Sequence, residues 1–158
     1  MEYSIDFSDR LIDAANSFVK KPNAGDEAGR AVLYLSLLAC EISLKFILEC
    51  AGFTPKELTK RSHDLHGLLT DICKCEIADP TIGDFVSAAK LLSVSPNPEA
   101  HDATVGQILD AESEGASKYP NEIRYGDLVR HFDAIHVLEC AKSLSGWAKA
   151  NIGSIRKR

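Results

Sequence analysis

Apolar residues recur every three or four positions along most of this chain, which is the spacing of an α-helix. The pattern is clearest in five segments, at about 5–19, 26–51, 62–72, 82–92 and 127–151. A weaker helical pattern covers 103–117, and the proline-containing stretch 93–102 is expected to be a loop. Apolar and polar residues do not alternate with period two over any useful length. We therefore expect an all-α fold, most simply an antiparallel bundle of four or five helices.

Residues that favour helix ends lie at several of these boundaries. Ser8 is a candidate N-cap for the first helix, and Gly52 is expected to end the second. Thr54-Pro55 has the order of an N-cap followed by a first-turn proline, which predicts a short helical turn at 55–60. Ser62 or Asp64 is expected to begin the third long helix.

The helix at 26–51 is apolar around most of its circumference, so it should be the central element. Glu41 and Lys45 interrupt it four residues apart, in the order that favours an ion pair within one helix. Two interpretations stay open. The pair lies on a solvated strip, or it is partly desolvated and faces a groove or a second subunit.

Length and composition are those of one globular domain. The chain has 158 residues, 45% of them hydrophobic and 26% charged. We expect a single helical domain at 1–153 and a basic C-terminal tail at 154–158. The net charge of −5 argues against coating nucleic acid by bulk electrostatics. Basic residues outnumber acidic ones from Asn121 onward, which indicates either a phosphate-binding face or a solvated helix with a disordered tail.

The sequence also bears on location, redox state and metals. No uncharged apolar run reaches about 18 residues, and the N-terminus lacks the basic and apolar regions of a signal peptide. We expect a cytoplasmic protein with no membrane contact. Its five cysteines are expected to be reduced and mostly buried. Cys73 and Cys75, two apart, have the wrong spacing to chelate zinc with His63 and His66, so neither a metal nor a cofactor is expected.

Two stretches of the chain resemble the HEPN superfamily. The first reads Ala39-x-Glu41-x-x-Leu44-Lys45-x-x-Leu48, with a glycine a few residues on, and continues after a turn as His63-Asp64-Leu65-x-x-Leu68-Leu69. The second, Tyr119-Pro120-x-x-x-Arg124-Tyr125-Gly126, precedes the last helix. The resemblance covers roughly residues 24–150.

The resemblance implies a compact, usually dimeric bundle with its active cleft between protomers. Many members are metal-independent endoribonucleases of toxin–antitoxin and phage-defence systems that use an Arg-x(4–6)-His motif near the last helix. Others are non-catalytic modules that bind nucleotides or pair with nucleotidyltransferases. The expected partners are therefore a second copy of the chain, RNA or a nucleotide, and an antitoxin or a nucleotidyltransferase.

Three pairs have the spacing of this motif. Arg61…His66 lies at the wrong end of the domain for the family, whereas Arg124…His131 and Arg130…His136 lie near the last helix. The candidate catalytic residues are thus Arg124, Arg130, His131 and His136, and the candidate binding residues are Glu41, Lys45, His63 and Tyr125.

Chemically, a histidine can take the proton of an RNA 2′-OH or protonate the leaving oxygen, and an arginine can hold the phosphate. The alternative for His136 is a satisfied core histidine. His131 has Asp127 as a local partner, and Arg124 could instead anchor its loop to carbonyls or to Glu41.

Overall fold

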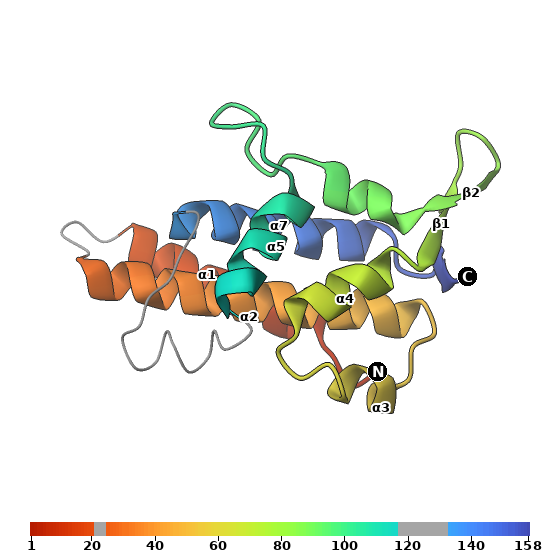
Figure 1. The fold of residues 1–158 in the computed structure, drawn as a ribbon, viewed down its shortest axis with the longest axis horizontal. Helices are drawn as coiled ribbons and strands as arrows, with labels where there is room; N and C mark the ends of the chain where they lie inside the picture. Colours follow the sequence, from red (N-terminus) through yellow and green to blue (C-terminus); the bar gives the residue numbers. More distant parts are fainter. Residues whose placement is uncertain (21–24, 117–132) are drawn as a thin grey trace.

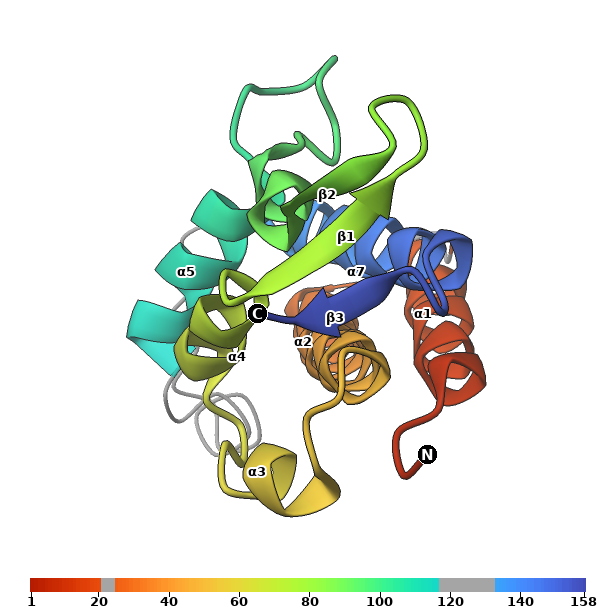
Figure 2. The same cartoon turned by 90° about the vertical axis from the view of Figure 1, so that its right-hand side faces the viewer.

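The computed structural model describes residues 1–20, 25–116 and 133–158. Its helices and strands follow one another in the order α1 (Ile5–Val19), α2 (Asp26–Cys50), α3 (Pro55–Thr59), α4 (Leu65–Ile72), β1 (Cys75–Asp79), β2 (Asp84–Ser87), the 3-10 helix η1 (Ala88–Ser93), α5 (Val105–Ala116), α7 (Ala134–Ala150) and β3 (Ile155–Lys157). Helices α1, α2 and α7 lie lengthwise beside one another (Figure 1). Seen along this layer, α4 and α5 lie on the side of α2 opposite α1, and a small sheet covers one end (Figure 2).

Helix α2 is the central element, as its all-round apolar pattern predicts. It packs against α1, α7, α4, α3 and β3. Among the described residues, α2 is also the one helix long and apolar enough to cross a membrane. An 18-residue window within Glu27–Cys50 has a mean hydropathy of 1.9, but 78% of that window is buried inside the fold. The core helix of a globular protein has the same length and composition, so this finding does not assign α2 to a membrane.

The expectation of an all-α antiparallel bundle is wrong in two respects. The described chain contains a three-stranded antiparallel sheet, with the strand order β2-β1-β3. In addition, α1 runs antiparallel to α2, whereas α7 runs in the same direction as α2 (Figure 1).

The predicted helix at 82–92 is wrong in its first half, because Asp84–Ser87 form strand β2. The second half, from Ala88, is helical and belongs to the 3-10 helix η1. Ile77 of β1 is opposite Val86, and Asp79 is opposite Asp84, with a turn between the strands. Gly83 takes the positive φ of 67° that this turn requires. Cys75 and Ile77 are buried while Glu76 is less so, but this alternation is too short to indicate a strand by itself.

Residues 155–157 are not a free tail, because they form β3. Ile155 is buried opposite Ile77, and the N–H of Lys157 donates to the carbonyl of Ala51 at 2.8 Å. Arg156 pairs with Glu76 at 2.6 Å. The basic end of the chain is therefore neutralised in part by acidic residues of β1 and α3.

Several predicted helix ends are confirmed. Gly52 has a φ of 99° just after α2, and Thr54 and Glu57 form a capping box at the start of α3. Asp64 caps α4 by accepting from the N–H of Gly67 at 2.9 Å.

Two other predicted ends are wrong. Ser4, rather than Ser8, caps α1; Ser8 is buried inside the helix, where it bonds to Ala39 and Ser43 of α2. The last helix begins at Ala134 and not at 127, because Asp133 has an extended backbone with φ −61° and ψ 143°. Residues 127–132 lie outside the described part of the chain.

Candidate functional site

The Glu41–Lys45 pair is buried and faces a turn of its own chain. Glu41 and Lys45 are only 4% and 5% exposed, so the solvated strip considered above is wrong. They face the turn that joins α3 to α4, which we call the 60–64 turn (residues 60–64). Lys45 Nζ donates to Glu41 Oε1 and to the carbonyl oxygen of Ser62, each at 2.7 Å. The second carboxylate oxygen of Glu41 lies 2.9 Å from Nδ1 of His63.

This arrangement compensates two charges that are almost removed from water. An isolated buried ion is very unfavourable, whereas a buried pair with further hydrogen bonds is tolerated. Glu41 has a partner on each oxygen, and Lys45 adds the ring of Tyr3, whose centroid lies 5.3 Å from Nζ. The His63 side chain remains 49% exposed, so the network connects the interior of α2 to the surface.

A second buried carboxylate holds the same turn. Arg61 makes a two-point contact with Asp71 of α4, at 2.7 and 2.9 Å, and Lys74 adds a bond of 2.6 Å. Burial alone would raise the pKa of Asp71, but the bonds from Arg61 and Lys74 outweigh it and hold this pKa below its usual value. Within the turn, Ser62 has the left-handed φ of 47°, a conformation that non-glycine residues rarely adopt.

A pair of histidines lies on a different face of the molecule. His136, in the first turn of α7, places Nδ1 3.1 Å from Nε2 of His101, which belongs to the connection between η1 and α5. The two rings meet edge to face, with centroids 4.4 Å apart and an interplanar angle of 82°. Both residues are partly buried. Within the described part of the chain, Nε2 of His136 has no hydrogen-bond partner.

The candidate residues named from the sequence are only partly described. Glu41, Lys45 and His63 are brought together, and His136 is paired with a residue that the sequence analysis did not single out. Arg124, Tyr125, Arg130 and His131 lie outside the described residues. Arg61 and His66 do not form a motif pair, since Arg61 binds Asp71 and His66 binds Asp110 at 2.7 Å.

His101 and Asp71 are the residues that sequence reasoning missed. His101 is separated from His136 by 35 residues and lies in a proline-containing loop, where no periodic pattern gives its direction. Arg61 and Asp71 are close in the sequence, because Arg61 lies just before the helix that ends near Asp71. An arginine and an aspartate ten residues apart do not, however, indicate a contact by themselves.

The cysteines fit the expectation of reduced, largely buried thiols. All five are free, with Cys40, Cys75 and Cys140 buried. Burial raises the pKa of Cys140 to about 12 and of Cys75 to about 11, so neither thiol forms the nucleophilic thiolate near neutral pH. In the described ranges, no group of three or more His, Cys, Asp or Glu side chains is arranged to hold a metal ion.

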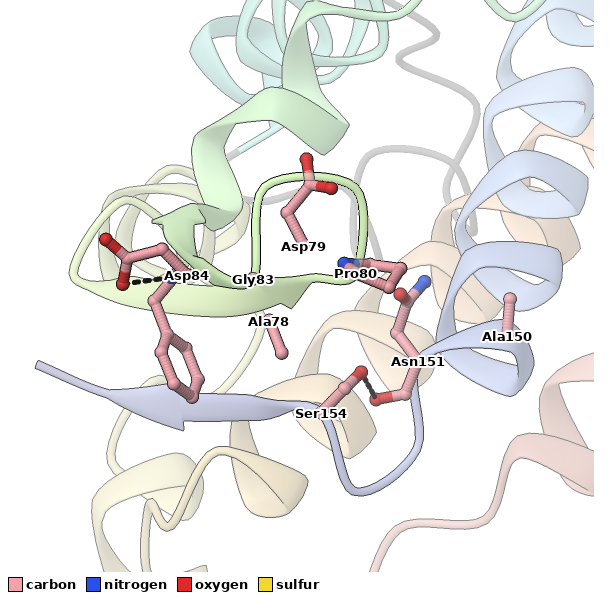
Figure 3. Close-up of a pocket in the computed structure, with 9 residues that line it drawn as sticks. Ala78, Asp79, Pro80, Gly83, Asp84, Ala150, Asn151 and Ser154 are labelled. Atoms are coloured by element: carbon pink, nitrogen blue, oxygen red, sulfur yellow. Dashed lines mark hydrogen bonds between the residues drawn. The ribbon is translucent and has the colours of Figure 1, made fainter.

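A pocket in the described part of the chain lies away from all of these groups. It has a volume of about 480 Å³ and is formed by the β1–β2 hairpin and the end of α7 (Figure 3). Ala78, Phe85 and Ala150 give it a largely apolar lining. The carboxylates of Asp79 and Asp84 at its edge accept from backbone N–H groups of their own hairpin. None of the candidate residues lines it, so this pocket does not form part of the candidate site.

Comparison with known proteins adds no relative. A scan against protein-family models found no match, and neither the curated proteins nor the solved structures gave a significant one. The HEPN resemblance therefore rests on the residues quoted above.

Proposed function

We propose that this chain is a HEPN-like protein that acts as a homodimeric, metal-independent endoribonuclease, with His136 as an acid–base group. The observation that carries the proposal is the fixed imidazole of His136. Its Nδ1 is held by His101 at 3.1 Å, which leaves Nε2 as the ring nitrogen that can meet a substrate. The position at the start of α7 also agrees with the place of the Arg-x(4–6)-His motif in the family that the chain resembles.

The spatial arrangement of the other matching residues supports the resemblance. Glu41 of one part of the first matching stretch and His63 of the other are 22 residues apart, yet their side chains are in direct contact. Lys45, the third polar residue of the pattern, bonds to Glu41 and to the residue preceding His63. The pattern thus corresponds to one interacting unit that fixes α4 against α2.

The proposed reaction needs no group beyond RNA and protein side chains. The 2′-oxygen attacks the adjacent phosphorus, and its proton passes to a base. The bond from phosphorus to the 5′-oxygen breaks, and this oxygen takes a proton from Nε2 of His136. The products are a 2′,3′-cyclic phosphate and a free 5′-OH. Arg124 or Arg130 would hold the phosphate charge, as the family motif implies, and His131 is the other candidate base.

The test is cleavage of RNA by the purified chain in the presence of EDTA, with DNA of the same sequence as the inert control. We expect His136→Ala to reduce the cleavage rate by about 10²–10⁴-fold, which is the usual contribution of a general acid or base. Arg124→Ala, Arg130→Ala and His131→Ala identify the remaining members of the site. His66→Ala is the matched control, since His66 has a carboxylate partner but lies outside the proposed site. Wild-type protein that is dimeric and leaves RNA intact would contradict the proposal.

The alternative function is a non-catalytic HEPN-like module that binds a nucleotide or a partner protein. The observation that favours it is the half-exposed His63, which the buried Glu41 and Lys45 hold in one orientation. A preorganised surface group of this kind suits binding. Titration calorimetry with nucleotides separates the two functions: binding that is lost in His63→Ala, together with intact RNA, supports the alternative.

A further inference from the structure

The connection that carries His101 is tied together by its own backbone. We call residues 94–105 the 94–105 loop. Its ends are joined by a bond of 2.9 Å from the N–H of Val105 to the carbonyl of Val94. Inside it, the N–H of His101 donates to the carbonyl of Asn97 at 3.2 Å, and the hydroxyl of Ser95 donates to the carbonyl of His101 at 3.1 Å. The backbone of His101 is therefore fixed on both sides, and its ring is presented to α7.

We propose that His101 is a positioning residue that keeps the proton of neutral His136 on Nε2. A hydrogen bond between two neutral imidazoles contains one proton, so one ring must donate and the other accept. If His101 donates from Nε2, then Nδ1 of His136 is bare and the proton of His136 lies on Nε2. A neutral histidine side chain in water already prefers its proton on Nε2, so this arrangement gives both rings their favoured tautomer.

The reverse arrangement is less favourable for both rings. It would place the proton of His136 on Nδ1 and the proton of His101 on its own Nδ1, an atom that is buried. Each ring would then adopt the tautomer that is disfavoured in water. The tautomer preference of both rings thus favours His101 as the donor and His136 as the acceptor in the neutral pair.

The consequence for catalysis rests on the proposed function. With its proton on Nε2, neutral His136 can donate a hydrogen bond to a phosphate oxygen of the substrate. When the pair takes up one further proton, His136 carries a proton on each nitrogen and donates from Nδ1 to Nε2 of His101, whose own proton now lies on Nδ1. Transfer of the Nε2 proton to the leaving 5′-oxygen then leaves the neutral pair in the reverse, less favourable arrangement. The pair returns to the favoured arrangement when His101 releases its Nδ1 proton, the proton between the rings moves to Nε2 of His101, and His136 takes a proton back on Nε2.

Nitrogen NMR of the full, ¹⁵N-labelled chain under mildly alkaline conditions tests the inference without any substrate. We expect Nδ1 of His136 to show the shift of a bare ring nitrogen and Nε2 that of a protonated one. A coupling across the hydrogen bond should connect Nε2 of His101 with Nδ1 of His136. His66→Ala should leave these signals unchanged. The reverse tautomer, or the mixture found in free imidazole without the coupling, would overturn the assignment.

Two variants of His101 relate the tautomer to activity. His101→Phe keeps a ring but removes both nitrogens, so His136 should lose its fixed orientation as well as its single tautomer, and kcat should fall roughly 10–100-fold with little change in KM. His101→Asn keeps a donor and should restore part of kcat.

If wild type shows the coupling but leaves RNA intact, the proposed function fails and the tautomer assignment stands. If wild type cleaves RNA without the coupling, the positioning role fails. The wild-type spectrum decides even if His101→Phe does not fold.

Discussion

The 60–64 turn and the 94–105 loop are both irregular connections fixed against a long helix, but by different means. The 60–64 turn is held by two buried carboxylates, Glu41 and Asp71, which bind cations and an imidazole. The 94–105 loop is held by neutral backbone and hydroxyl bonds and reaches α7 through one imidazole pair. Buried charges make a connection rigid because breaking their pairing is costly, whereas the loss of one hydrogen bond between neutral groups costs much less. We therefore expect the first region to contribute stability and the second to contribute chemistry.

The largest expected effect is the loss of one partner of the buried ion pair. Lys45→Met leaves the carboxylate of Glu41 without its cation at a position that is 4% exposed. We expect the free energy of unfolding to fall by about 3–5 kcal/mol. Urea denaturation followed by circular dichroism measures this change.

A double variant is the matched control for Lys45→Met. Glu41→Leu combined with Lys45→Met removes both charges, so it should be much less destabilising than the single change. If Lys45→Met alone is neutral, the ion pair does not hold the 60–64 turn, and the contrast between the two regions fails.

The next largest effect concerns the contribution of Asp71 to stability and its loss at acid pH. The pKa of Asp71 is below its ordinary value of 3.8 in the folded protein, so its contribution is complete above the unfolded value and is lost as the pH falls through the lower, folded one. Asp71→Asn should reduce stability at neutral pH by about 1–3 kcal/mol, because Arg61 loses a charged partner while staying partly in water. The variant should also lose less stability than wild type as the pH falls from about 4 through the lower, folded pKa of Asp71. Parallel pH-dependent denaturation curves show whether this difference is present; equal acid dependence would contradict it.

The contrast also explains what the sequence could and could not predict. The 60–64 turn lies between two strongly patterned helices, and Glu41 and Lys45 are conspicuous because they interrupt an apolar helix. Local signals of this kind identified the helix ends at Gly52, Thr54 and Asp64. The contact between Glu41 and His63 follows once these two helices pack together.

The sheet and the histidine pair depend on contacts between distant residues. Strand β1 pairs with residues 155–157, some eighty positions away, and its own alternation is too short to indicate a strand. His101 and His136 meet only because the loop closes on itself through Val94 and Val105. The direction of α7 relative to α2 is likewise not encoded by any local pattern.

A smaller effect distinguishes two histidines of the α4 region. His63 bonds to a carboxylate that is 6% exposed, whereas both side chains of the His66–Asp110 pair are largely exposed, at 70% and 49%. His63→Ala should therefore reduce the free energy of unfolding by about 1 kcal/mol, because Glu41 loses one of its two partners. His66→Ala should change it by less than about 0.5 kcal/mol. Equal effects in urea denaturation would mean that the burial of Glu41 does not strengthen its bond to His63.

The smallest expected change in stability comes from His101→Ala. This substitution removes one neutral, partly solvated N–H···N bond and leaves the bonds of Val105 and Ser95 to the loop backbone in place. We expect a loss of about 0.5–1 kcal/mol, the net value of an ordinary hydrogen bond. If the same variant reduces RNA cleavage at least tenfold at a temperature where it remains folded, the imidazole pair serves the reaction rather than the fold. A loss of several kcal/mol would instead place His101 with Lys45 among the residues that hold the structure together, and the distinction between the two regions would disappear.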